Sequence, residues 1–280
     1  MTATVARRRD FGRARVRETL RAVGKAAQSA LVATGAVLLL WVFALWALDV
    51  PTFVGKGPID VANWLFTVPA ADENRALVLT QLGQTLADAA IGFATGLGAA
   101  LVLAAVFLLL RPVEHALMPI ALLLQSVPLI AIAPIIILIF GRGGVTVAVM
   151  GGLVVLFPAL VTIVFGLRSA SPVMIDLVHV YGGNGFEVLR RVALPASVPA
   201  LFAAIRVSVP GALTGALIAE WLATGQGIGR GIVSAIGQAR MSEVWALTVV
   251  VTAVSIVLYL VVTLVEASVV TRLGMRRADT

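Results

Sequence analysis

The chain has 280 residues, of which 60% are hydrophobic and only 12% are charged, and its mean hydropathy is +1.04. This composition excludes an ordinary soluble domain and is typical of an all-α polytopic membrane protein. The chain has no cysteine, which excludes disulfides, thiolate metal sites and a cysteine nucleophile. The net charge of +7 does not indicate nucleic acid binding, because Lys and Arg gather beside the apolar segments, where they favour contact with the lipid bilayer.

Residues 1–27 form a basic segment, which contains Arg7, Arg8, Arg9, Arg13, Arg15, Arg17, Arg21 and Lys25. Two interpretations stay open: a surface helix resting on anionic headgroups, or, for the first ten residues, a disordered tail. The apolar run that follows lacks a small-residue cleavage site and is long enough to span a membrane. A cleaved signal peptide is therefore not predicted.

Six apolar segments follow, and we predict six transmembrane helices at about residues 28–48, 82–110, 116–140, 145–167, 200–222 and 244–271. Together they make a permease domain over 28–272, with a short tail at 273–280. Between the first two spans, the sequence IDVANWLF predicts a short interfacial helix within a polar segment, 49–80. The chain has no Walker motif, so we expect it not to hydrolyse ATP itself.

The basic residues predict the orientation. With the N-terminus in the cytoplasm, 16 Lys and Arg residues lie on the inner side: eight in the N-terminal segment, three at the C-terminal end (Arg272, Arg276 and Arg277), and Arg111, Arg168, Arg190, Arg191 and Arg206. Five lie on the outer side: Lys56, Arg75, Arg142, Arg230 and Arg240. Because positive loops stay inside, we expect a multi-pass protein of a bacterial cytoplasmic membrane with both termini in the cytoplasm.

Residues 172–199 are polar although apolar spans flank them. Pro172 suits the first position of a helix, and Gly182 and Gly183 can close that helix with left-handed backbone. Asn184 is a predicted N-cap of a second helix, with Glu187 three residues later as in a capping box. The segment is therefore predicted to be a folded cytoplasmic helix-turn-helix loop that contacts another protein. The alternative is a basic amphipathic loop lying on the inner lipid face.

This loop resembles the cytoplasmic loop of ATP-binding-cassette (ABC) importer permeases, which reads EAA, three residues, Gly, nine residues, I-x-LP. The residues aligned with this pattern, whether or not they match its letters, are the expected ATPase-coupling residues, and Glu187 of the predicted capping box is added to them. The set is Asp176, Leu177, Val178, Gly182, Glu187, Val192, Leu194 and Pro195. Leu177 and Val178 replace the two alanines of the family pattern.

The spans themselves resemble the nitrate, taurine and alkanesulfonate branch of these permeases. The resemblance is carried by SVPLIAIAPIIILIFG with Pro128 and Pro134, by TLADAAIGF, by the Arg206 segment, and by Glu220-Trp221 before GQGIGRG. Asp88 stands where that branch usually has a basic residue. The two prolines each remove a backbone donor and predict a bent third span.

Charged residues inside spans invite a functional interpretation. The candidate pathway or gating residues are Pro128, Pro134, Arg206 and Glu220. For Arg206, two roles stay open: lining the path, or pairing or snorkelling within the bundle. Asp88 and Glu220 are expected at a wet outer interface, Glu266 is expected to be structural, and GQGIGRG is expected to be a loop. No metal site is predicted at His115 or His179, because a second ligand at useful spacing is missing.

The resemblance implies the type I ABC importer permease (MetI-like) fold and a non-catalytic subunit that forms a translocation path by alternating access. It also implies the partners: an ABC ATPase dimer, which binds ATP and Mg so that this chain needs no cofactor, a second permease copy, and an extracytoplasmic solute-binding protein. The implied substrate is a sulfonate, taurine or nitrate. The alternatives are a thiamine precursor or riboflavin-like nutrient, or, in another class, ion-coupled secondary transport.

Overall fold

The computed structural model describes residues 32 and 34–272, so the predicted basic segment 1–27 and the tail 273–280 lie outside the described residues. The chain divides into two units, residues 1–63 and 64–280. The first contains an apolar helix, Thr34–Ala47, and most of α2, Pro58–Phe66. The Asp60 carboxylate accepts a 2.8 Å hydrogen bond from the Gly57 amide, which caps α2. A short helix is thus present where IDVANWLF predicted one.

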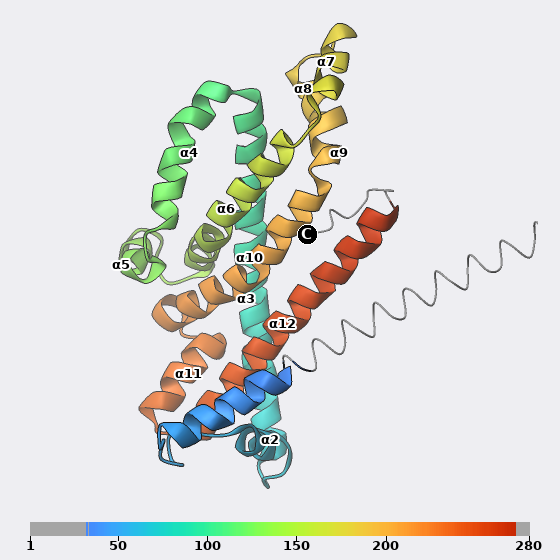
Figure 1. Cartoon of the computed structure of the whole chain (residues 1–280). Helices are drawn as coiled ribbons and strands as arrows, with labels where there is room; N and C mark the ends of the chain where they lie inside the picture. The colour runs from blue at the N-terminus through green and yellow to red at the C-terminus, as the bar shows by residue number, and fades with distance from the viewer. Residues whose placement is uncertain (1–31, 33, 273–280) are drawn as a thin grey trace, which may run out of the picture. The chain divides into compact units, whose positions relative to one another are not determined.

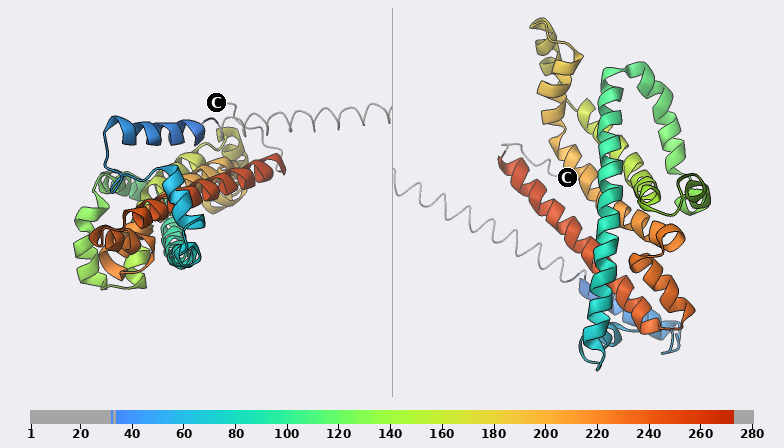
Figure 2. Two further views of the ribbon diagram at one scale, coloured as in Figure 1. Left: turned by 90° about the horizontal axis from the view of Figure 1, so that it is seen from below. Right: turned by 180° about the vertical axis from the view of Figure 1, so that it is seen from behind.

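The second unit is a bundle built on three long helices, α3 (Ala71–Leu109), α6 (Gly144–Arg168) and α10 (Val198–Ala219). Helix α12 (Met241–Arg272) packs on α10 and on α11 (Gly227–Gly237). After α3, helix α4 (Arg111–Gln125) runs back beside it, and α5 (Leu129–Phe140) leads into α6 (Figure 1). Seen from behind, α3 runs nearly the full length of this unit (Figure 2).

The structure does not confirm six spans. Among the described residues, four helices are long and apolar enough to cross a membrane, or five if α4 and α5 form one broken span. These two helices meet at 106°, so the bend predicted in this segment is present, as a full break between two helices. The break lies at Pro128, which caps α5 in an extended conformation (ψ 121°) and has no amide hydrogen to continue α4. The described part of the first predicted span, Thr34–Ala47, is too short to count as a span.

Helix α3 begins earlier than predicted. Its first turn contains Asp72 and Glu73. Both residues belong to the polar segment 49–80, which was predicted to lie outside any span. Acidic side chains stabilise a helix N-terminus because they oppose the positive end of its dipole. Charge near the start of this span therefore extends the helix and does not end it.

The three central helices meet at glycine. A Cβ atom built on Gly92 of α3 would lie 2.7 Å from the Cα of Gly151 of α6, and one built on Gly215 of α10 would lie 2.7 Å from the same Cα. One turn along α3, a Cβ on Gly96 would lie 3.0 Å from the Cα of Gly152. Small residues let membrane helices approach closely and gain dispersion contacts where lipid provides no hydrophobic driving force. Gly151 is the residue that both neighbouring helices contact.

We predict that Gly92→Ala lowers the thermal stability of the detergent-solubilised protein, by about 1–3 kcal/mol, because a methyl group there forces α3 and α6 apart. The matched control is Gly98→Ala on the same helix, where a Cβ meets nothing within 4 Å. That variant should be neutral or slightly stabilising, since alanine favours helix over glycine. Equal melting temperatures for the two variants would contradict the close-contact account.

Candidate functional site

The predicted helix-turn-helix is present. Helix α7 (Pro172–Val180) has Pro172 at its first position, and Gly182 takes a left-handed φ of +79° after it. The turn is closed by the Gly183 amide, which donates to the Val178 carbonyl at 2.8 Å. Helix α8 (Gly185–Val188) then starts at Asn184, whose side chain accepts a 3.0 Å hydrogen bond from the Glu187 amide. The capping residue and the left-handed backbone of Gly182 are therefore confirmed. Gly183 closes the turn through its amide but does not take a left-handed φ.

One half of the predicted capping box is replaced by another contact. A carboxylate oxygen of Glu187 lies 3.0 Å from a guanidinium nitrogen of Arg191, one helical turn later. The chain continues from α8 through a π-helical turn, η1 (Leu189–Ala193), into the short α9 (Leu194–Ala196). The described segment 185–196 is thus helical but not one regular α-helix, as the single second helix of the prediction would be.

The loop is anchored on one side. Leu189, Val192 and Ala193 are buried in the same apolar cluster as Phe107 of α3 and Leu167 of α6. Among the predicted coupling residues, Val192 therefore faces the bundle, and Leu194 and Pro195 lie in the link to α10. Any displacement of η1 must move these packed side chains, because protein interiors have few voids that could absorb it.

The other side of the loop is exposed and apolar. None of the nine residues of α7, all of them described, is buried. Leu177 is 48% exposed, and Val180, Tyr181 and Phe186 are 83%, 84% and 60% exposed. Beside them is a cavity of about 450 Å³ lined by Leu177, Val178, Tyr181, Gly183, Glu187 and Arg191. A large exposed apolar patch with charges at its rim is typical of a protein interaction site. The structure brings five predicted coupling residues, Asp176, Leu177, Val178, Gly182 and Glu187, into this region.

Of the two roles left open for Arg206, an ion pair supports pairing within the bundle. An Arg206 guanidinium nitrogen lies 3.1 Å from a carboxylate oxygen of Glu266 on α12. Their side chains are 25% and 14% exposed. The pair ties α10 to α12 and neutralises both charges where a lone charge would be costly. The expectation that Glu266 is structural agrees with this contact, and a role for Arg206 in the path stays a prediction.

The expectation of a wet interface at Glu220 and Asp88 is wrong, because both residues are buried. Glu220 begins a π-helical turn, η2 (Glu220–Thr224), and its carboxylate accepts a 2.7 Å hydrogen bond from the Gly229 amide. The expectation of a loop at GQGIGRG is also wrong, because Gly227 starts α11. Glycine-rich sequence folds into a helix here because Glu220 satisfies an amide that the first turn leaves without a partner. Thr85 of α3 satisfies the next one, by accepting from the Ile228 amide at 2.9 Å.

A second cavity, of about 630 Å³, lies at the break between α4 and α5. Val127 and Leu129 line it on either side of Pro128, and Pro158 of α6 lies opposite. Its polar lining comes from Gln125 of α4 and Thr214 of α10, and the lining residues of the described chain carry no charge. Sequence reasoning missed Gln125 and Thr214, although a polar side chain within an apolar segment was a visible signal.

Comparison with known families decides what this arrangement belongs to. Residues 92–274 match the family described as "Binding-protein-dependent transport system inner membrane component". The chain belongs to this family. It is therefore a multi-pass, helical ABC permease subunit, a non-catalytic component that works with an ATPase and a binding protein in the family at large.

Three relatives show how far this permease resembles other proteins. It is 30% identical to a probable ABC transporter permease protein of Haemophilus influenzae, over 61% of this chain and 67% of the relative. It is 34% identical to the riboflavin transport system permease protein RibX of Chloroflexus aurantiacus, over 33% of this chain and 35% of the relative. It is 29% identical to the formylaminopyrimidine transport permease protein ThiX of Halalkalibacterium halodurans, over 46% and 52%.

We predict that Arg206→Met destabilises the permease by about 1–3 kcal/mol, because it leaves the largely buried Glu266 carboxylate without its partner. The double variant Arg206→Met, Glu266→Leu should recover most of that loss, since apolar groups of similar size replace a buried ion pair at little cost. Thermal unfolding in detergent measures both. A double variant as unstable as the single one would contradict the pairing. Lost transport in a stable double variant would place Arg206 in the path.

Proposed function

We propose that this permease forms the membrane path of an ABC importer for a small nutrient, and that α7 and α8 dock on the ATPase subunits. The observation that carries the proposal is the two-sided loop. Val180, Tyr181 and Phe186 are exposed for a partner, whereas Leu189 and Val192 are buried in the bundle. A loop built in this way can pass a displacement from the partner to α3, α6 and α10.

The mechanism we infer is alternating access. ATP binding closes the ATPase pair, which carries the docked loops with it, and the helices joined to them change their tilt. Free energy enters only because the ATP-bound and empty ATPase pairs hold the loop differently. At the break between α4 and α5, with Pro128 at its centre, the two helices meet at 106°. We propose that Pro128 and Pro134 permit the movement there.

The complex we propose contains two permease copies around a two-fold axis, two ATPase subunits inside and a solute-binding protein outside. One copy has too few spans to enclose a complete path, and a second identical copy closes the path through a self-complementary surface. The 16 to 5 distribution of basic residues supports the orientation with the coupling loop and both termini in the cytoplasm.

The cavity lining favours one substrate class over the other. We propose that the cavity at the α4–α5 break is part of the path. A sulfonate, taurine or nitrate would carry its charge into this cavity, whose lining residues, among those described, are uncharged, and burying an unpaired charge is expensive. Arg206, the candidate cation for pairing with an anion, is held by Glu266. We therefore propose a ring-bearing nutrient of the riboflavin or thiamine-precursor type, which apolar walls with Gln125 and Thr214 would accept.

The test is ATP hydrolysis and uptake by the full complex in liposomes, with the binding protein added together with riboflavin, a formylaminopyrimidine, taurine or nitrate. We expect stimulation by a ring-bearing compound. Stimulation by taurine or nitrate alone would contradict the substrate class and leave the importer function in place. An ATPase subunit that does not associate with the permease would contradict the importer function itself.

The coupling role predicts that Gly182→Val uncouples the complex. Left-handed backbone costs a β-branched residue about 1–2 kcal/mol, so α7 should tilt against α8 while the spans stay folded. Substrate-stimulated ATP hydrolysis should fall severalfold. The matched control is Gly225→Val, where φ is +67° and the surrounding space is equally open, but away from the loop. Full coupling in Gly182→Val would mean that the loop is only a surface helix.

The orientation can be tested directly because the natural chain has no cysteine. A cysteine at the exposed Val180 of α7 and one at the exposed Glu73 near the start of α3 should react from opposite sides of the membrane. A membrane-impermeant maleimide applied to intact cells should label Glu73→Cys, and Val180→Cys should react only after the cells are opened. Labelling of both in intact cells would contradict the proposed topology.

A further inference from the structure

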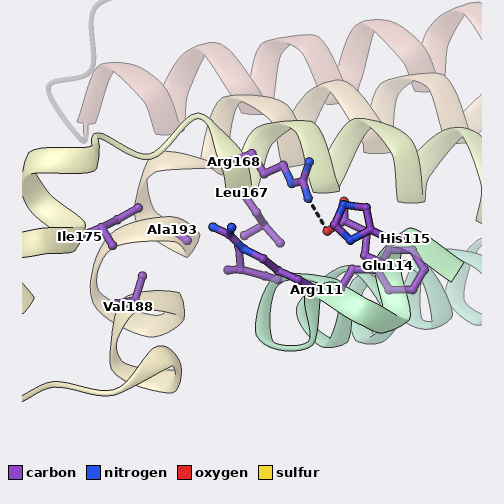
Figure 3. Close-up of a pocket in the computed structure, with 10 residues that line it drawn as sticks. Arg111, Glu114, His115, Leu167, Arg168, Ile175, Val188 and Ala193 are labelled. Carbon is purple, nitrogen blue, oxygen red and sulfur yellow. Dashed lines mark hydrogen bonds and ion pairs between the residues drawn. The ribbon is translucent and has the colours of Figure 1, made fainter. Parts of the chain in front are cut away.

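A third cavity, of about 440 Å³, lies between the ends of the long helices and the loop. From the bundle it is lined by Phe107 and Leu108 of α3, by Arg111, Glu114 and His115 of α4, and by Leu167 and Arg168 of α6. From the loop segment it is lined by Ile175 of α7, Val188 of α8 and Ala193 of η1 (Figure 3). The coupling function described above does not use its charged residues.

The charges in this cavity do not balance. Arg168 and the buried Glu114 form an ion pair, which neutralises one cation and the acid among the lining residues. Arg111 makes no side-chain hydrogen bond or ion pair with another residue of the described chain. Figure 3 shows its side chain extending from the start of α4 toward the part of the cavity lined by Leu167 and Ala193. His115 lines the same cavity beside Glu114. One guanidinium is thus left to meet an anion.

The apolar part of the lining and the location narrow the kind of anion. Phe107, Leu108 and Leu167 belong to the last turns of α3 and α6, where the apolar helices end. Leu109 and Leu110 next to them are 41% and 52% exposed. A cavity with apolar walls and a basic rim, at the level where spans end, matches the phosphate and glycerol region of a phospholipid.

We propose that this cavity binds the headgroup of an anionic phospholipid, with the Arg111 guanidinium donating to the phosphate. Arginine suits this role because its planar fork can donate two parallel hydrogen bonds to phosphate oxygens. The bound lipid contacts both the helix ends and residues of α7, α8 and η1. Occupancy therefore braces the coupling loop against the bundle.

The experiment measures thermal unfolding of the purified full chain in neutral detergent during titration with dioleoyl phosphatidylglycerol, dioleoyl phosphatidylcholine or inorganic phosphate. We expect phosphatidylglycerol to raise the melting temperature at concentrations where the other two do not. Arg111→Gln should weaken the apparent affinity about five- to tenfold, as loss of one interfacial cation implies. Arg111→Lys should retain the preference for the anionic lipid with a smaller loss, since it keeps the charge and loses the fork.

Arg230→Gln is the matched control, because Arg230 is an exposed cation on α11 that does not line this cavity. It removes the same net charge and should leave the response to phosphatidylglycerol unchanged. Equal losses in Arg111→Gln and Arg230→Gln would overturn the proposal in favour of general surface attraction. A response to inorganic phosphate as strong as that to phosphatidylglycerol would overturn the lipid assignment. Because the measurement uses the chain without ATPase or substrate, its outcome is independent of the proposed import function.

Discussion

The close approach of α3, α6 and α10 at glycine is the constraint on which the rest of the second unit depends. Gly92 and Gly215 both approach the backbone of Gly151, so a side chain at any of these positions would separate the helices. In a membrane, lipid is as apolar as leucine, and packing of helix on helix must supply the association energy. Helix α6 lies against both α3 and α10 at this point. This contact therefore sets the position of the loop that follows α6 and of the cavity at the α4–α5 break.

Polar side chains connect the central helices to the helices around them. Arg206 and Glu266 join α10 to α12, Arg168 and Glu114 join α6 to α4, and Glu220 holds the first turn of α11. Each of these contacts links segments that the glycine contact does not fix. A charge without a partner at such a depth would cost more than an exposed one, so these pairs select one arrangement of the outer helices over others.

The loop at residues 172–199 has one exposed side and one side buried in the bundle. Its first helix has no buried residue among those the structure describes, while η1 is embedded in the bundle through Leu189, Val192 and Ala193. A loop that merely rested on lipid would need no such anchor. The proposed lipid site lies between these two parts, so binding there would affect the stiffness of the connection through which we propose that the ATPase acts.

The sequence alone determined the helical membrane class, the loop and its turn. The membrane class follows from the hydropathy of the chain as a whole. The turn follows from Gly182 and Asn184, which fix the backbone over only a few residues, so neither inference requires knowing which segments are in contact. The sequence did not determine the burial of Glu220 or the helix formed by GQGIGRG. Those features depend on partners far along the chain. Thr85, for example, accepts a hydrogen bond from the amide of Ile228, which lies 143 residues away in the sequence. Only the tertiary structure brings such groups together, because hydropathy records how apolar a segment is and not which segment it contacts.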